Sequence, residues 1–174
     1  MFLHRTTELS GAGSFNPYFS EGRIWITRAK GAEVTSVDAT TGAVLAHLPT
    51  GRHPRFLTAG NGAIWTLNQG DGTLSRIDMS DGEPAQTLAL GTPGPGGDIT
   101  YGAGKIWTTF FKVPLSIVDA SVPALLCQWA GPGGDSIGFG HDAIWLTNYK
   151  AGTISRIALA DIPSDCHVIS PANR

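Results

Sequence analysis

The pair Ile-Trp recurs four times along the chain with a nearly constant spacing. The copies Ile24-Trp25, Ile64-Trp65, Ile106-Trp107 and Ile144-Trp145 lie 40, 42 and 38 residues apart. A period of this length is typical of architectures that stack copies of one supersecondary unit. The sequence therefore predicts four similar structural repeats.

Each repeat carries turn signals on both sides of its tryptophan. The preceding turns are Ser20-Glu21-Gly22, Gly60-Asn61-Gly62, Gly102-Ala103-Gly104 and Gly140-His141-Asp142. Such residues accept the positive φ that two-residue hairpin turns require. In the first two repeats a second turn follows, at 39–42 and 79–82, and leads into a last strand-like run. Each repeat is predicted to form four antiparallel strands, named a to d in chain order.

Four antiparallel strands in roughly forty residues are typical of a β-propeller blade. The runs at 23–27 and 143–147 are bulky on both faces, as expected for strands covered by a neighbouring blade on each side. We predict an all-β protein with four four-stranded blades, at about 11–50, 51–92, 93–131 and 132–172. The four tryptophans are interpreted as packing residues between the blades.

Composition limits the classes of partner. A net charge of −2, with 12 Lys and Arg residues and no basic run, argues against nucleic acid or an anionic membrane as a partner. No stretch approaches the roughly 18 apolar residues of a membrane span. Residues 1–10 lack the apolar core of a signal peptide.

The sequence allows three interpretations of how these blades close into a ring. When the sequence is shifted by one repeat, residues 2–9 align with the d strand at 42–49, so residues 1–10 are predicted to be the outer strand of a preceding blade. Because a propeller must close its ring, the chain could be a closed four-bladed ring or a homodimer joined through its open blade edges. It could also be the C-terminal part of a seven- or eight-bladed propeller. We favour the third arrangement, and then the dimer.

The repeat resembles that of streptogramin (virginiamycin B) lyases and related bacterial propellers. The resemblance lies in Ala63-Ile64-Trp65-Thr66-Leu67-Asn68, in Gly72-Thr73-Leu74-Ser75-Arg76-Ile77-Asp78 and in the matching segment 142–157, and it covers nearly the whole chain. It implies that the d–a and b–c loops share one face around a central channel, where ligands bind. It also favours an extracytoplasmic location, which the sequence otherwise leaves unknown.

Several polar residues fall in these loops. We expect a small molecule or peptide to be bound by Arg28, Arg52, Arg55, Asn68, Asn148, Tyr149 and Lys150. His53 is the candidate catalytic residue, because the two flanking arginines disfavour its imidazolium form and leave it able to act as a general base. The alternative interpretation is that these side chains are simply solvated in exposed loops.

A repeated Gly-Gly-Asp motif suggests a metal site. Asp98 and Asp135 follow glycine pairs at the starts of two adjacent a strands. Together with amide oxygens such as those of Asn68 and Asn148, these carboxylates could bind Mg²⁺ or Ca²⁺, which prefer oxygen ligands. Alternatively, each Asp accepts hydrogen bonds from its own glycine-rich turn.

Three functions of different class follow. The favoured one is a binding propeller without catalytic activity. The second is a metal-dependent lyase or lactonase, in which the resemblance implies a His base and an Mg²⁺ ion held partly by Glu. The matching blade positions hold Arg28, Asn68, Phe110 and Asn148 instead of an acidic residue. The third is a structural half-ring that dimerises. Whether Cys127 and Cys166 form a disulfide is left open.

Overall fold

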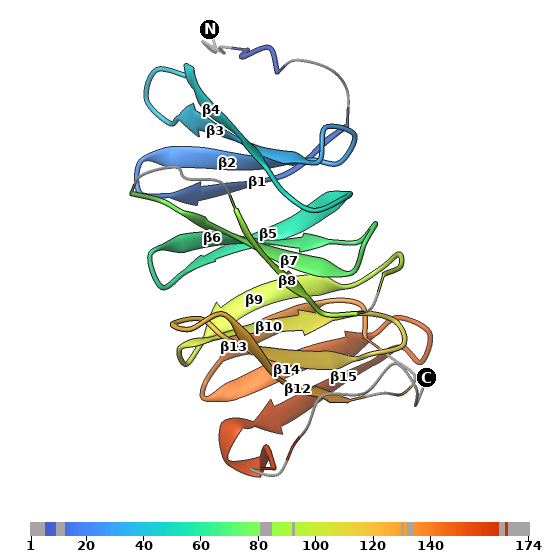
Figure 1. The fold of residues 1–174 in the computed structure, drawn as a ribbon. Coiled ribbons are helices and arrows are strands. Elements are labelled where there is room, and N and C mark those ends of the chain that lie inside the picture. The colour runs from blue at the N-terminus through green and yellow to red at the C-terminus, as the bar shows by residue number, and fades with distance from the viewer. Residues whose placement is uncertain are drawn as a thin grey trace, which may run out of the picture.

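The computed structural model describes residues 6–9, 13–80, 85–91, 93–129, 131, 134–163 and 166. Within these residues the strands form four antiparallel sheets that are stacked face to face (Figure 1). The first sheet contains β1 (Ser14–Ser20), β2 (Arg23–Arg28), β3 (Glu33–Asp38) and β4 (Val44–Pro49). The second contains β5 (Pro54–Gly60), β6 (Ala63–Asn68), β7 (Thr73–Asp78) and β8 (Gln86–Ala89).

The third sheet contains β9 (Asp98–Gly102), β10 (Lys105–Thr109), β11 (Leu115–Asp119) and β12 (Ala124–Trp129). The fourth contains β13 (Ile137–Gly140), β14 (Ala143–Asn148) and β15 (Thr153–Ala158), followed by the short 3₁₀ helix η1 (Leu159–Asp161). Each sheet has its strands in sequence order, as in a propeller blade. The predicted all-β propeller class is confirmed, and we call the sheets blades 1 to 4.

Two predicted outer strands extend beyond the described residues. The d strand of blade 4, expected before residue 172, falls largely on residues 164–172, of which only Cys166 is described. Of the segment 1–10, residues 6–9 are described and are not in a strand. Thr7 Oγ1 donates a hydrogen bond of 2.6 Å to the carbonyl of Gly42, in the c–d turn of blade 1. The outer strand of a preceding blade stays a prediction.

The turns between the a and b strands have the predicted backbone. Each consists of two residues with positive φ, for example 52° at Asn61 and 71° at Gly62. The turn of blade 4 uses His141 and Asp142, with φ of 52° and 51°. Two consecutive left-handed residues define the type I′ turn, whose twist matches that of the flanking strands. The hairpins form because the sequence places tolerant residues at these positions.

Three of the four repeated tryptophans pack between blades, as predicted, while Trp145 of blade 4 is only partly buried. Trp25 lies in a core cluster with Leu57 and Ile64 of blade 2, and Trp65 lies in one with Ile99 and Ile106 of blade 3. Trp107 packs in the same way against blade 4. Alternate residues of each b strand thus face opposite neighbours, because successive strand side chains point to opposite sides of a sheet.

The four blades form an open stack. The innermost strands β1, β5, β9 and β13 contact one another in series. Blades 1 and 4 lie at opposite ends of this stack (Figure 1), so the closed four-bladed ring is not the observed arrangement. Among the described residues, no helix has the length and apolar character needed to cross a bilayer.

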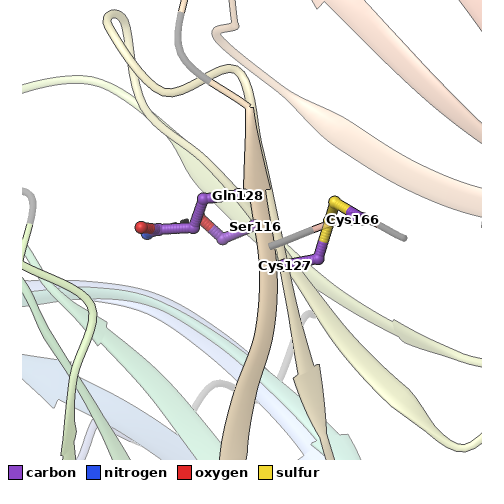
Figure 2. Close-up of a disulfide and its surroundings, with 4 residues drawn as sticks. All are labelled: Ser116, Cys127, Gln128 and Cys166. Atoms are coloured by element: carbon purple, nitrogen blue, oxygen red, sulfur yellow. Dashed lines mark hydrogen bonds between the residues drawn. A yellow bond between two sulfur atoms is a disulfide. The ribbon is translucent and has the colours of Figure 1, made fainter. Parts of the chain in front are cut away.

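A disulfide joins the segment after blade 4 to blade 3. Cys127 on β12 is bonded to Cys166, with the two Cα atoms 5.4 Å apart. Figure 2 shows the disulfide on one side of β12 and Gln128 on the other, where Gln128 Nε2 donates to the hydroxyl of Ser116 at 3.2 Å. Cys166 also packs against the core cluster between blades 3 and 4. The pairing that the sequence left open is therefore present in the structure.

We expect the double variant Cys127→Ala/Cys166→Ala to be markedly less stable than the wild type. The two cysteines are 39 residues apart, and closing a loop of this size stabilises by about 4 kcal/mol in the chain-entropy model. Urea unfolding measures the difference. Reduced wild-type protein is the matched control and should unfold at the same urea concentration as the variant; equal stability of variant and oxidised wild type would contradict the expectation.

An aspartate anchors the c–d turn of three blades. In blade 3 the carboxylate of Asp119 accepts hydrogen bonds from the hydroxyl of Ser121 at 2.6 Å and from the backbone N–H groups of Val122 and Ser121 at 3.0 and 2.8 Å. These bonds favour the ionised form and lower the pKa of Asp119 from 3.8 to about 2. Hydrogen bonds from Thr41 lower the pKa of Asp38, and those from Ser80 lower that of Asp78.

Asp119 should stabilise the fold only while it is ionised. Because its folded-state pKa is lower than its unfolded value, its contribution is complete above about pH 4. That contribution is lost as the pH falls through about 2, the pKa of the folded state. We expect Asp119→Asn to be less stable than the wild type at pH 5, with the difference shrinking toward pH 2. Urea unfolding at several pH values tests this, with Asp161→Asn as a control for removing one surface carboxylate. A difference that does not change with pH would contradict it.

Candidate functional site

The d–a and b–c loops lie at the same end of the blades, as the hydrogen bonds between them show. The N–H of Gly70 in a b–c loop donates to the carbonyl of Arg52 in a d–a loop at 2.9 Å. The N–H of Gly94 donates to the carbonyl of Gln69 at 2.9 Å, and that of Gly131 to the carbonyl of Lys112 at 3.2 Å. These bonds link the loops of successive blades into one surface, which we call the loop face.

A cavity opens on the loop face between blades 2 and 3. Its volume is about 390 Å³, and it is lined by His53, Gln69, Gly70, Pro93, Gly94 and Pro95. Three separate loops supply these residues: the d–a loop entering blade 2, the b–c loop of blade 2 and the d–a loop entering blade 3. The cavity combines an imidazole, a carboxamide and two apolar proline rings. We call it the 53/69/94 cavity.

His53 lies in the left-handed backbone region, with a φ of 53°. Other described non-glycine residues, such as Glu21 and Ala103 in hairpin turns, adopt the same conformation, so it marks a tight turn in the loop. The conformation is held by the b–c loop, because the N–H of Gln69 donates to the carbonyl of His53 at 3.0 Å. The imidazole is exposed and lines the cavity. The structure thus fixes the backbone of His53 and leaves its side chain open to a ligand.

Gln69 holds the glycine- and proline-rich loop that forms the opposite wall. Its side-chain Nε2 donates to the carbonyl of Gly96 at 2.5 Å, while its backbone carbonyl accepts from the N–H of Gly94. The ring of Phe111 covers Gly96 so closely that a Cβ at this position would overlap it. Gln69 and Phe111 therefore hold the loop at 93–96 in place, because this glycine- and proline-rich loop has few side chains of its own that could do so.

Charged groups surround the cavity. Arg52 is exposed and lies against Gly70, where a Cβ would meet the Arg52 side chain and backbone. The backbone N–H of Arg52 donates to the carboxylate of Asp71 at 2.7 Å, and this carboxylate also accepts from the hydroxyl of Thr73 at 2.7 Å. Arg55 is exposed, and its guanidinium lies 5.1 Å from the centre of the Phe56 ring. The d–a loop entering blade 2 thus presents positive charge around His53.

Asn68, predicted to bind a ligand, lies in the interior. It has no exposed surface. Its Nδ2 donates to the hydroxyls of Thr73 and Ser75 at 2.9 and 2.8 Å, and its Oδ1 accepts from the hydroxyl of Thr66 at 2.9 Å. This amide connects β6 to β7, and we do not include it in the candidate site.

Arg28 is likewise buried rather than presented on the loop face. Its Nη1 donates to Glu33 Oε1 at 2.5 Å, across the ends of β2 and β3. The same carboxylate oxygen lies 3.1 Å from Nδ1 of His47 on β4. Arg28 therefore belongs to a structural ion pair of blade 1.

The remaining predicted ligand-binding residues lie in blade 4. Asn148 ends β14, and its Oδ1 accepts from the N–H of Ala151 at 3.1 Å, which stabilises the b–c turn. Tyr149, with 78% of its surface exposed, and Lys150 project from that turn. They belong to the loop face but not to the lining of the 53/69/94 cavity.

The two predicted metal-binding carboxylates, Asp98 and Asp135, lie at the junction of blades 3 and 4. Asp98 accepts from the N–H of Ile99 at 2.8 Å and from the hydroxyl of Ser136 at 2.6 Å, so it links blades 3 and 4. Asp135 precedes that serine in the chain. Among the described residues no group of three His, Cys, Asp or Glu side chains gathers. A metal ion bound by Asp98 and Asp135 stays a prediction.

His53 lines the cavity, and its role as a catalytic or binding residue stays a prediction. Gln69, Gly70, Pro93 and Pro95 also line the cavity and were not among the predicted site residues. One signal was available, because the d–a connection entering blade 3 is longer than that entering blade 2. Extra residues in one loop of a regular repeat commonly mark the binding face.

Comparisons with known proteins identify the fold. No family model matches the chain, and neither does any curated protein. Among solved structures, a streptogramin B lyase superimposes with a TM-score of 0.74 at 21% identity, over 93% of this chain and 59% of that chain. BamB from Moraxella catarrhalis gives 0.66 at 12% identity, over 80% of this chain and 41% of that chain. The computationally designed Ika4 protein gives 0.68 at 16% identity, over 87% of this chain and 95% of that chain.

The chain spans only 59% of the lyase and 41% of BamB, although most of its own length is matched. At these identities the likeness concerns the fold and not the chemistry. The stacked four-stranded sheets and these superpositions together assign the chain to the β-propeller fold.

Proposed function

We propose that this protein is a binding propeller that holds a small molecule or peptide in the 53/69/94 cavity. The observation that carries the proposal is the convergence of three loops, from two adjacent blades, on one cavity. The cavity has a volume of about 390 Å³ and is open to solvent, so a ligand bound there would keep part of its surface exposed. The preferred ligand has an anionic group and an apolar part.

The chemistry of the walls supports this ligand class. The proline rings of Pro93 and Pro95 give an apolar surface, and His53 lines the cavity as well. The exposed Arg52 precedes His53 in the same loop and could reach a ligand there. A guanidinium binds carboxylate or phosphate with paired, charge-assisted hydrogen bonds. The ordered backbone of both walls lowers the entropic cost of binding, because the loops need not reorganise.

A lyase or lactonase is the second candidate, favoured by the superposition on streptogramin B lyase over 93% of this chain. In this reading His53 would act as the general base. The candidate needs carboxylate ligands for Mg²⁺ that the described residues do not gather. Binding without catalysis therefore accounts for more of the site.

The disulfide favours a location outside the cytoplasm. A bond such as Cys127–Cys166 forms and persists in oxidising compartments and is rare where thiols are kept reduced. We include an extracytoplasmic location in the proposal. Its test is the redox state of the two cysteines in the native host, measured by alkylation and mass spectrometry.

We expect fragments carrying a carboxylate to bind in the cavity and to perturb the amide NMR signals of Gln69, Gly70 and Gly94. A library of small aromatic and aliphatic carboxylic acids, with their amides as matched neutral probes, provides the ligands. For the best carboxylate, Arg52→Ala should weaken binding roughly ten-fold or more, because it removes a charge-assisted hydrogen bond. Gln69→Ala should weaken it too, through loss of loop order.

Two controls make this test specific. Lys105→Ala removes a positive charge at the start of β10, at the end of blade 3 opposite the loop face, and should leave the affinity unchanged. His53→Asn removes the imidazole but keeps a residue that tolerates positive φ, so its loss of affinity would report the side chain. Perturbations that scatter over other blades, or equal affinity for acids and amides, would contradict the proposal.

The enzymatic candidate is tested separately. We expect no opening of a streptogramin B macrocycle when it is incubated with this chain and Mg²⁺, as followed by liquid chromatography. Ring opening that His53→Asn abolishes would establish the lyase instead.

A further inference from the structure

Two interfaces between blades share a contact in which an aromatic ring lies on a glycine. Gly60, at the end of β5, is covered by the ring of Tyr101 on β9, so that a Cβ at residue 60 would overlap the ring. Gly102, at the end of β9, is covered in the same way by Phe139 on β13. In both cases the residue before the last of an a strand packs on the last residue of the preceding a strand.

At the interface between blades 1 and 2, both residues of this contact differ in size, and we call the relation between their sizes the size rule. Blade 1 ends its a strand with Ser20 instead of glycine, and blade 2 has Ala59 where blades 3 and 4 have an aromatic ring. Ala59 packs against the cluster that contains Trp25. The glycines at two interfaces therefore correspond to aromatic rings on the next blade, whereas Ser20 at the third corresponds to the small Ala59.

At the two ends of the stack, the glycine and the aromatic ring of this contact each lack a partner among the described residues. Gly140 ends β13, and a Cβ placed there would meet nothing within 4 Å. Trp145 already donates its indole N–H to the Gly140 carbonyl at 3.2 Å, as Trp65 and Trp107 do to Gly60 and Gly102. At the other end Phe19, in the ring position of blade 1, is 64% exposed.

Other residues on the two end faces are also exposed where their counterparts at the internal interfaces are buried. Ile154 of blade 4 is 64% exposed, whereas its counterparts Val34, Leu74 and Leu115 are buried by the next blade. Ile24 of blade 1 is partly exposed, whereas its counterparts Ile64, Ile106 and Ile144 are fully buried by the preceding blade. Arg156 lies over Trp145 at 5.9 Å, the distance at which the half-buried Arg76 lies over Trp65. The end faces are therefore built like the internal interfaces.

We propose that two copies of this chain form an eight-bladed ring, in which Phe19 of each copy packs on Gly140 and Trp145 of the other. A two-fold axis places blade 1 of each copy against blade 4 of the other, which gives two equivalent interfaces. Both end faces of both copies are then covered, as closed symmetry requires. Eight blades lie within the usual range of propellers.

The second copy is favoured as the occupant for two reasons. The chain itself supplies a ring, Phe19, that obeys the size rule for a glycine such as Gly140. In addition, 87% of this chain superimposes on 95% of the computationally designed Ika4 protein, so a solved chain of about this extent exists. The three described strands of blade 4, of four, six and six residues, cover roughly 250 Å² per face from ordinary strand spacings. Two interfaces, each with two such faces, then bury roughly 1,000 Å² in total, which reaches the lower limit for a specific protein interface.

The molar mass in solution tests this inference, measured by sedimentation equilibrium over a range of protein concentrations. We expect a dimer that dissociates on dilution and no larger species. Gly140→Val should raise the dimer dissociation constant more than about ten-fold, because it fills the space that Phe19 needs. It should leave the monomer folded, since the position is extended strand and open. Phe19→Glu should act likewise, while Val122→Glu, on an exposed turn of blade 3, should not.

A compensating pair separates this contact from any other dimer. Gly140→Ser alone should weaken the dimer, and Phe19→Ala/Gly140→Ser, which copies the Ser20 and Ala59 pair, should restore part of the affinity. A monomer at all concentrations would overturn the inference and assign the end faces to another occupant, such as further blades. So would a dimer that Gly140→Val does not weaken, or a series of species growing beyond the dimer.

Discussion

The packing of one blade on the next is the interaction on which this structure depends. A four-stranded sheet has two faces, and each must be covered by apolar contact to be stable in water. Here the tryptophan face of one blade is covered by the isoleucine face of the next, as in the cluster that holds Trp65 and Ile106. No blade has a core of its own, because its strands are one layer thick. Stability is therefore shared between neighbours, and the ends of the stack have the same need as its middle.

This constraint also explains the position of the candidate site. Where two blades meet, their d–a and b–c loops are brought side by side and hydrogen-bonded, as at Gly70 and Arg52. The sheets fix the separation of the loops, and the loops are free to vary because they carry little of the packing. A longer connection between blades 2 and 3 then builds a wall around His53 without disturbing the sheets. Rigid blades and variable loops are the usual division of labour in repeat proteins.

The disulfide and the aspartate turns act at the outer rim, where blades diverge and packing is weakest. Cys127 and Cys166 bind the last described segment to blade 3. Asp38, Asp78 and Asp119 hold the c–d turns through hydrogen bonds to local hydroxyl and N–H groups. The inner rim relies on a different device, the aromatic ring on glycine, because the a strands are closest there. Different parts of one blade are thus stabilised by different chemistry according to their distance from the axis.

The sequence by itself determined the repeat, the strands and their turns, because these depend on local spacing and on residues such as Asn61 and Gly62 that accept a left-handed backbone. It also determined that the tryptophans face neighbouring blades. Only the tertiary structure decided that Asn68 and Arg28 are buried, that Gln69 orders the loop at 93–96, and that Asp98 bonds to blade 4. Asn68 and Arg28 are bonded to residues on adjoining strands of their own blades, and the hairpin pairing sets those contacts. The contacts of Gln69 with Gly96 and of Asp98 with Ser136 join residues of different blades, 27 and 38 positions apart, and no local pattern records them.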